Sequence, residues 1–165
     1  MQKEAIKIYT DGAARGNPGP AGWGAVFILQ EKKSEKIFEM GGRSDHATNN
    51  QMELTAAIEG LKYLKKNGIN MAVQIFADSK YVILGITEWI INWQKNNWRN
   101  AAKKPVLNRE LWEELYKLTE EFKPTWEYVK GHNGDKWNDR ADEIATSFAD
   151  DMPVELKNKS AINAG

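Results

Sequence analysis

The spacing of the apolar residues changes once along this chain, near residue 48. Before that point the sequence predicts three strands, over residues 4–10, 22–30 and 36–41, and no helix. The polar stretch EKKSE is short enough to join the last two strands as a hairpin. Strands that follow one another through short turns pair most simply in antiparallel fashion. The first part of the chain is therefore expected to form an antiparallel three-stranded sheet.

From residue 48 onward, helical and strand-like segments alternate. Leu54, Ile58 and Leu61 lie at helical spacing, and the preceding sequence TNNQ, which begins at Thr48, fits a capping box. The basic residues and the glycine of KKNG, residues 65–68, predict the end of this helix. The later predicted elements are a strand over residues 72–77, a helical stretch capped by Ser79 that continues through Trp89 and Trp93, a helix capped by Asn108, a strand over residues 125–129, and a final helix with Trp137, Ala141, Ile144, Ala145 and Phe148 inward.

This order of elements predicts an α/β fold. Strands that follow helices usually add in parallel, so we expect a mixed five-stranded sheet, with three antiparallel strands plus two parallel ones, flanked by helices. A chain of 165 residues suits one domain, which we place at residues 1–150. The polar and unpatterned residues 151–165 are expected to form a flexible C-terminal tail.

The composition excludes several classes of site and partner. The chain has no cysteine, which rules out disulfides and thiolate metal sites and suits a reducing cytoplasm. No run of residues is long and apolar enough to span a membrane, and the stretch MQKEAIKIYTD is too charged for a signal peptide. We therefore expect a cytoplasmic protein without a membrane partner. Because the formal net charge is 0, a nucleic-acid partner would have to be held by a local basic patch.

The glycine-rich stretch YTDGAARGNPGPAGWG, residues 9–24, is not a nucleotide-binding loop. A P-loop needs a Gly-Lys-Ser/Thr sequence that opens a helix, and a dinucleotide loop needs G-x-G-x-x-G before a helix. Neither pattern is present, and the residues that follow, AVFIL, favour a strand. The glycines are compatible with a turn between two strands, but such a turn does not explain why Asp11 ends the first strand.

Two predicted strands end in an aspartate, Asp11 after the first and Asp78 after the fourth. If these strands are parallel neighbours, both side chains emerge together at the carboxyl edge of the sheet, where ligands bind in open α/β folds. Clustered carboxylates repel one another unless a cation sits between them, and hard divalent ions prefer carboxylate oxygens. The residues alone do not identify further members, because the chain has 23 acids. A calcium-binding structural module is not supported, since no D-x-[DN]-x-[DN]-G loop is present.

Four motifs in order, YTDGAARGNPGPAGWG, TNNQMELTAAIEGL, IFADSKYV and VKGHNGDKWNDRADEIA, resemble type I ribonuclease H in its bacterial single-domain form. The similarity runs from about residue 5 to about residue 150. It implies a ribonuclease H-like fold and an endonuclease that hydrolyses the RNA strand of RNA–DNA hybrids. It also implies two Mg²⁺ ions as cofactors, with Mn²⁺ as a possible substitute, and products with 5′-phosphate and 3′-hydroxyl ends.

The resemblance implies a catalytic and metal-binding quartet of Asp11, Glu53, Asp78 and Asp142. Glu53 is expected in the first turn of its helix, where the helix dipole favours an anion or its ligand. Asp142 fits the family spacing from Asn138, and the two residues share a helix face, although neighbouring Asp139 remains an alternative.

His132, in the loop between Gly131 and Gly134, is a fifth catalytic candidate. A lone histidine in a loop is usually an exposed surface residue. The resemblance implies instead that His132 shuttles protons or helps the product to leave, and a pKa near neutrality suits proton transfer.

The segment from Trp89 to Arg109 contains no acid and carries five cationic side chains among tryptophans. Local positive charge of this kind is typical of a surface that binds a phosphate backbone. The alternative is an ordinary solvated helix pair whose tryptophans pack in the core. The resemblance implies the basic protrusion and the DNA-strand channel of the family.

A ribonuclease for hybrids has to detect the 2′-hydroxyl group, which backbone and amide groups in the minor groove can do. The resemblance places Gly16, Asn17, Asn49 and Asn50 at the grooves of the hybrid. The full set of substrate-binding candidates is Gly16, Asn17, Thr48, Asn49, Asn50, Trp89, Trp93, Lys95, Trp98, Arg99, Lys103, Lys104, Asn108, Trp112 and Asn138. The expected partner is an RNA–DNA hybrid duplex bound by a monomer. A non-catalytic hybrid-binding protein or a DNA-acting nuclease of the same fold are the alternatives.

Overall fold

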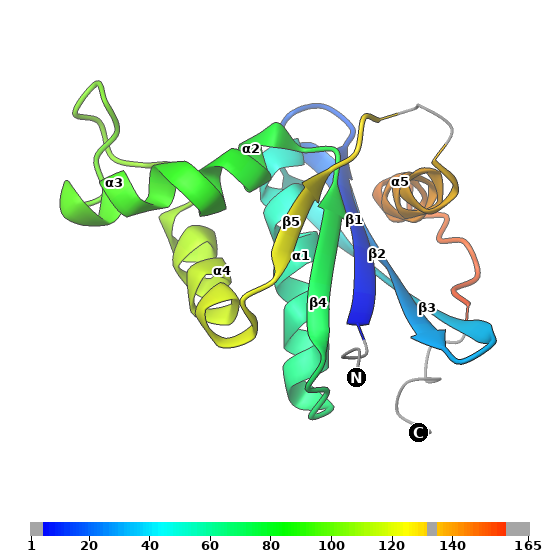
Figure 1. The fold of residues 1–165 in the computed structure, drawn as a ribbon. Coiled ribbons are helices and arrows are strands. Elements are labelled where there is room, and N and C mark those ends of the chain that lie inside the picture. The colour runs from blue at the N-terminus through cyan, green and yellow to red at the C-terminus, as the bar shows by residue number, and fades with distance from the viewer. Residues whose placement is uncertain (1–4, 132–134, 158–165) are drawn as a thin grey trace.

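The computed structural model describes residues 5–131 and 135–157, and in these residues it confirms the predicted sheet. The five strands have the order β3-β2-β1-β4-β5 (Figure 1). The pairs β1/β2 and β2/β3 are antiparallel, whereas β1/β4 and β4/β5 are parallel. The strands are β1 (Ala5–Ala14), β2 (Gly19–Glu31), β3 (Ser34–Ala47), β4 (Ala72–Ala77) and β5 (Thr125–Tyr128).

Helices cover both faces of the sheet. Figure 1 shows α1 and α4 on one face and α5 on the other, while the segment from α2 to α3 extends away from the sheet as a protrusion. The helices are α1 (Asn49–Lys66), α2 (Lys80–Leu84), the π-helical turn η1 (Gly85–Trp89), α3 (Ile90–Lys95), α4 (Arg109–Phe122) and α5 (Lys136–Ala149). None of the helices in these residues has the length and hydropathy needed to span a bilayer.

The alternation of side chains along β1 and β2 divides the core between the two faces. Ile8 and Phe27 belong to a large apolar cluster with Leu61 of α1 and Leu115 of α4. On the other face, residues such as Tyr9 and Val26 pack with Ala141 and Ile144 of α5. Successive residues of a strand point to opposite faces, so one strand contributes to both clusters.

The predicted start of α1 is confirmed. The Thr48 hydroxyl accepts a hydrogen bond from the Gln51 N–H at 3.1 Å, and the Gln51 side-chain oxygen accepts one from the Thr48 N–H at 2.9 Å. The prediction that Asn108 caps α4 is wrong in one respect. Asn108 occupies the N-cap position with a φ of 62°, but its side chain makes no capping hydrogen bond to the helix.

Strand β3 continues to Ala47, six residues beyond the predicted end at residue 41. Two glycines follow one another at this point, and glycine disfavours a strand interior. In the structure, Gly41 faces Phe148 of α5 and Gly42 faces the Trp23 ring, each so closely that a β-carbon would clash. These neighbouring side chains fill the space above the glycines, and pairing with β2 keeps the backbone extended.

Residues 151–157 pack against the domain, whereas the sequence analysis expected a flexible tail from residue 151. The Val154 N–H donates to the Ser147 hydroxyl at 3.1 Å, and the Lys157 carbonyl accepts a hydrogen bond from the Glu39 N–H at 3.0 Å. Val154 and Leu156 also contact the apolar cluster beneath α5. The segment is mostly polar, but Val154 and Leu156 are two positions apart and both pack against this cluster.

Candidate active site

The register of β1 and β4 places Asp11 and Asp78 side by side, as the sequence predicts. The parallel pairing of these strands ends at Thr10 and Ala77; Asp11 is the next residue of β1, and Asp78 directly follows the end of β4. Strand β1 does not end at Asp11, because it continues to Ala14 in pairing with β2 alone. The two carboxylates therefore lie at the carboxyl end of β4, where its pairing with β1 stops.

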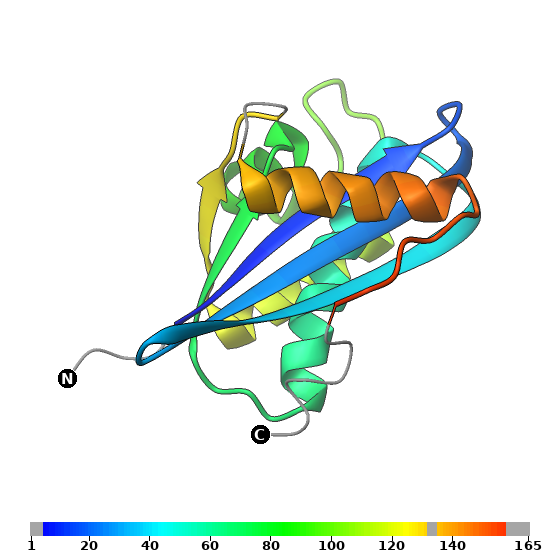
Figure 2. The same cartoon turned by 90° about the vertical axis from the view of Figure 1, so that its right-hand side faces the viewer.

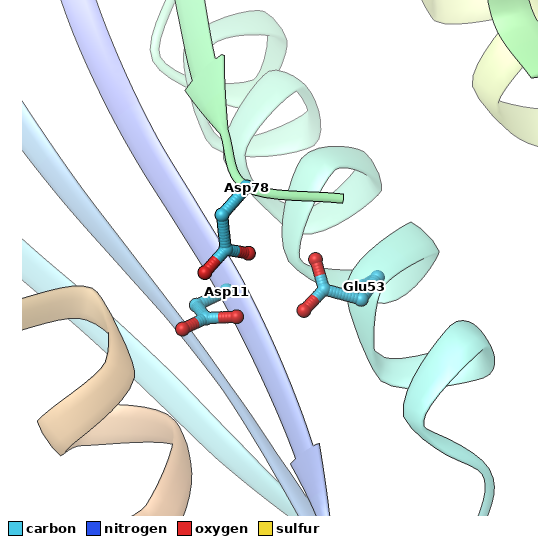
Figure 3. Close-up of side chains that lie close together, drawn as sticks. All are labelled: Asp11, Glu53 and Asp78. Atoms are coloured by element: carbon cyan, nitrogen blue, oxygen red, sulfur yellow. The ribbon is translucent and has the colours of Figure 1, made fainter. Parts of the chain in front are cut away.

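Glu53 of α1 completes a group of three acids. One carboxylate oxygen from each of Asp11, Glu53 and Asp78 lies within 4.8 Å of the others, and Figure 3 shows the three side chains pointing toward one another. The prediction that Glu53 lies in the first turn of α1 is wrong, because the helix starts at Asn49 and its first turn contains no acid. The helix dipole falls off within that turn, so it does little to hold this carboxylate.

The backbone of Gly12, which the sequence analysis did not single out, holds two of the acids. Its N–H donates to Glu53 Oε1 and to Asp11 Oδ1, at 2.8 Å in each case. A β-carbon at Gly12 would lie 2.5 Å from the Glu53 nitrogen, so only glycine allows α1 to approach β1 this closely. In the sequence, the only sign of this role is that a glycine directly follows Asp11.

Asp11 and Glu53 are held in an environment that disfavours their negative charge. Burial, followed by the neighbouring carboxylates, raises the pKa of Asp11 well above its usual range. Burial is also the main cause that raises the pKa of Glu53, with further contributions from the charges of Asp78 and Asp142. Within the described residues, Glu53 Oε2 is buried and has no hydrogen-bond partner. An unsatisfied buried oxygen that faces two more carboxylates fits the donor set of a hard divalent cation.

Asp142 lies outside the group of three but acts on it. Its charge contributes to the raised pKa values of both Asp11 and Glu53, so this α5 side chain is close to the cluster. Asp139 instead lines a hollow beside Glu39 of β3 and Lys157. The assignment of Asp142 as the fourth acid stays a prediction.

His132 lies outside the described residues, but the loop before it can be followed to Gly131. A β-carbon at Gly131 would lie 2.9 Å from Asp78 Oδ2. The start of this loop therefore passes directly over the acidic cluster, and a side chain at residue 131 would enter the site.

A groove lined in part by the first residues of α1, the helix that carries Glu53, brings together several predicted substrate-binding residues. Asn17, Thr48, Asn50, Trp93 and Asn108 all line it. Two hydrogen bonds join its walls: the Asn49 N–H donates to Asn17 Oδ1 at 3.0 Å, and Gln51 Nε2 donates to Asn108 Oδ1 at 3.2 Å. Tyr81, which the sequence analysis missed, also lines the groove, and its hydroxyl accepts hydrogen bonds from Asn108 and Trp112 at 3.1 Å each.

The predicted basic segment forms the protrusion and its following loop, with its cations exposed. The exposed cationic side chains are Lys95, Arg99, Lys103, Lys104 and Arg109. Gly16, in the loop between β1 and β2, is also exposed and has a φ of 79°. These residues are placed where a long polyanion could contact them.

Three residues assigned to substrate binding are buried instead. Trp112 is 0% exposed, Trp98 is 9% exposed and Asn138 is 2% exposed. Trp112 packs at ring-centroid distances of 5.1 Å from Tyr81 and 5.3 Å from Trp93, and is a core residue. Trp89, by contrast, is 37% exposed. The helical spacing of the tryptophans could not separate the face that packs on α4 from the face that meets solvent.

Comparisons with known proteins agree with this geometry. The family model described as RNase H matches residues 3–150. A ribonuclease H of Thermosynechococcus vestitus is 46% identical over 150 residues, which cover 91% of this chain and 92% of the relative. A ribonuclease H of Erythrobacter litoralis is 49% identical over 145 residues, which cover 88% and 96% of the two chains.

Among solved structures, the crystal structure of LC9-RNase H1 matches with a TM-score of 0.82 and covers 99% of this chain and 86% of its own. At 20% identity this similarity supports the fold alone. The match to the family model and the two relatives extend over most of the sequence and include the strands and helices that carry the acidic cluster. The chain therefore belongs to the ribonuclease H family.

Proposed function

We propose that the protein is an endonuclease that hydrolyses the RNA strand of RNA–DNA hybrids, with two Mg²⁺ ions as cofactors and Mn²⁺ as a possible substitute. The observation that carries the proposal is the group formed by Asp11, Glu53 and Asp78, whose oxygens lie within 4.8 Å of one another in a chain of this family. The products carry 5′-phosphate and 3′-hydroxyl ends.

The residues of the cluster have distinct tasks. Asp11, Glu53, Asp78 and Asp142 hold the divalent cations, and the Gly12 N–H keeps two of these carboxylates oriented. When bound, such ions activate the attacking water and stabilise charge on the leaving oxygen. His132 moves a proton at the site or helps the product to leave, since an imidazole can gain or lose a proton near neutral pH.

The groove and the protrusion hold the two strands of the hybrid. The exposed amides of Asn17, Asn49 and Asn50 lie close to one another and present donors and acceptors to a minor groove, where the 2′-hydroxyl distinguishes RNA from DNA. Thr48 and Asn108 lie in the same groove, near a phosphate of the DNA strand. The cations of the protrusion bind further phosphates without reading sequence.

A cleavage assay on three labelled duplexes tests this function. In Mg²⁺ the protein is expected to cut the RNA strand of an RNA–DNA hybrid and to leave all-DNA and all-RNA duplexes of the same sequence intact. A chelator should abolish cutting, because the clustered carboxylates alone cannot activate water. Cleavage of the DNA duplex at an equal rate would support a DNA-acting nuclease of the same fold. Hybrid binding without any cleavage would support a non-catalytic binding protein.

Removing two cations from the protrusion should weaken binding through the phosphate backbone. In the double variant Lys103→Ala and Lys104→Ala, the slope of log K against log salt is expected to flatten by up to about two, since each phosphate contact contributes about 0.9. Binding is measured by fluorescence anisotropy of a labelled hybrid between low and moderate salt.

The matched control is the double variant Lys32→Ala and Lys33→Ala, which removes two exposed lysines from the turn between β2 and β3. This turn lies at the far end of the sheet from the protrusion (Figure 1). The control should retain the salt slope of the unaltered chain. The same slope in both double variants would show that Lys103 and Lys104 do not contact phosphate.

A further inference from the structure

We propose that the buried ion pair between Glu39 and Arg140, together with the C-terminal segment 151–157, sets the position of Asp142 relative to the other three acids. In this view Glu39 and Arg140 are positioning residues for the metal site. The inference rests on the proposed function only in that it takes Asp142 to be a metal ligand.

Helix α5 sits on a part of the sheet where glycines stand among the apolar side chains. A β-carbon at Gly24 of β2 would lie 2.6 Å from the Ala141 carbonyl, and one at Gly22 would clash with the Ala145 carbonyl. This glycine floor lets the helix approach the sheet closely. Beside the glycines, Tyr9 and Val26 pack against α5, and contacts on the flanks of the helix act together with this packing to fix its rotation.

Arg140 and Asp142 lie on opposite flanks of α5, one on each side of Ala141. Successive helical residues are about 100° apart, so these two side chains are about 200° apart around the helix axis. Arg140 pairs with Glu39 of β3 and Ala141 lies over Gly24 of β2, so the flank that carries Asp142 lies on the side of β1. A rotation of α5 about its axis that lifts one of these side chains from the sheet lowers the other.

The Glu39 carboxylate is held by more donors than a surface ion pair has. Arg140 donates from Nε to Glu39 Oε2 at 2.7 Å and from Nη2 to Oε1 at 2.9 Å, and the Glu39 side chain is only 3% exposed. Burial would raise the pKa of Glu39, but the hydrogen bonds from Arg140 and from the Lys157 N–H outweigh it and hold this pKa below its usual range. The pair therefore stays charged and keeps its two-pronged geometry at neutral pH.

The C-terminal segment closes over this pair. The Lys157 N–H donates to Glu39 Oε1 at 2.7 Å, and Arg140 Nη2 donates to the Glu155 carbonyl at 2.9 Å. Figure 2 shows the segment leaving the end of α5 and running back alongside β3. The segment thus binds both members of the pair and joins the edge strand to the helix that carries Asp142.

A small rotation of α5 has a large consequence at the acidic cluster. Asp142 directly follows Ala141, which lies over Gly24, the β2 residue paired with Asp11, yet Asp142 lies outside the group of three acids. Whether a bound cation gains a fourth carboxylate thus depends on a small displacement of this side chain. Replacing a residue that orients a metal ligand, without contacting the metal itself, commonly lowers the affinity for the metal.

Calorimetric titration with Mn²⁺ in the absence of hybrid tests the inference. Glu39→Gln keeps the side-chain volume but removes the charge that pairs with Arg140, and it is expected to weaken Mn²⁺ binding about tenfold. In an Asp142→Asn background the same substitution should have no further effect, because the ligand that it positions is gone. The matched control is Glu121→Gln, which breaks an ion pair with Lys65 at 3.1 Å, away from α5, and should leave Mn²⁺ affinity unchanged in both backgrounds.

An equal loss of affinity in both backgrounds, or no loss in either, would overturn the proposal. Lys157→Pro removes the N–H that binds Glu39 together with the Lys157 side chain, and it is expected to give a smaller loss that Asp142→Asn again cancels. This variant decides the question if circular dichroism shows that Glu39→Gln fails to fold. Because no hybrid is present, failure of the unaltered chain to cleave hybrids would defeat the proposed function and leave this result standing. Failure of the unaltered chain to bind Mn²⁺ would overturn both.

Discussion

Replacing Asp11 with Asn is expected to lower the rate of hybrid cleavage in Mg²⁺ by at least about a thousandfold, which corresponds to about 4 kcal/mol of transition-state stabilisation. Asp11 is 3% exposed, and one of its carboxylate oxygens lies within 4.8 Å of an oxygen of Glu53 and of Asp78, so the substitution removes one of three clustered acids. Hybrid binding should largely survive, because the groove and the protrusion are unchanged. The rate is measured in single-turnover cleavage of a labelled hybrid, and binding by anisotropy in Ca²⁺.

The same substitution should stabilise the metal-free protein. The pKa of Asp11 in the folded chain is raised above its ordinary value of 3.8, so its contribution to stability is full below that value and is lost as the pH rises. The free energy of unfolding of the unaltered chain in a chelator is therefore expected to fall between about pH 4 and pH 7. Asp11→Asn should remove part of this fall and raise Tm at pH 7 by at least about 3 °C. Thermal unfolding followed by circular dichroism measures both effects.

Asp139→Asn is the control for both measurements. It makes the same chemical change on α5, in a side chain that is exposed and lines a hollow away from the cluster. The control should cleave at nearly the unaltered rate and should show the same pH dependence of Tm as the unaltered chain. Substantial cleavage by Asp11→Asn in Mg²⁺ would contradict the assignment of the site, and a lower Tm in chelator would contradict the account of its electrostatics.

The pairing of Asp11 with Asp78 could be predicted because it depends on local signals that agree with one another. Each aspartate follows a clear run of strand residues in the sequence, and the helix that precedes β4 makes a parallel addition of this strand the simplest topology. The capping box at Thr48 fixed the start of α1 in the same way. Where the hydrophobic period, the capping residues and the connection lengths agree on one topology, that topology can be predicted without knowledge of the tertiary contacts.

Contacts between distant segments could not be predicted. The distance from Asp142 to the cluster depends on the rotation of α5, which no local pattern encodes. Glu39 resembled any other polar residue on an edge strand, and its burial becomes visible only when Arg140 and Lys157 meet it from more than 100 positions away. The tryptophans of the protrusion are a third case, since their spacing is the same whether they pack on α4 or face solvent.

Replacing Trp112 with Ala is expected to lower the free energy of unfolding by about 3–5 kcal/mol, as large buried aromatic residues do. The side chain is 0% exposed, and its ring lies so close to Gly85 that a β-carbon there would clash with it. The substitution leaves a cavity between α4 and the π-helical turn η1, and it removes a donor from the Tyr81 hydroxyl that also holds Asn108 in the groove. Denaturant titration measures the loss, with circular dichroism as the signal.

Trp89→Ala tests whether a tryptophan of the protrusion contributes to hybrid binding without contributing much to stability. Trp89 suits this test because it is exposed to solvent. Its ring is 37% exposed and lies 6.0 Å from Trp93. The substitution should cost less than about 1 kcal/mol of stability and weaken hybrid binding about tenfold, as loss of an exposed aromatic contact to nucleic acid does. Trp112→Ala should instead lower the stability strongly and leave hybrid affinity nearly unchanged, when that affinity is measured on the folded fraction. If Trp112→Ala were stable and bound hybrid poorly, this ring would contact substrate after all, and α4 would have to move on binding to expose it.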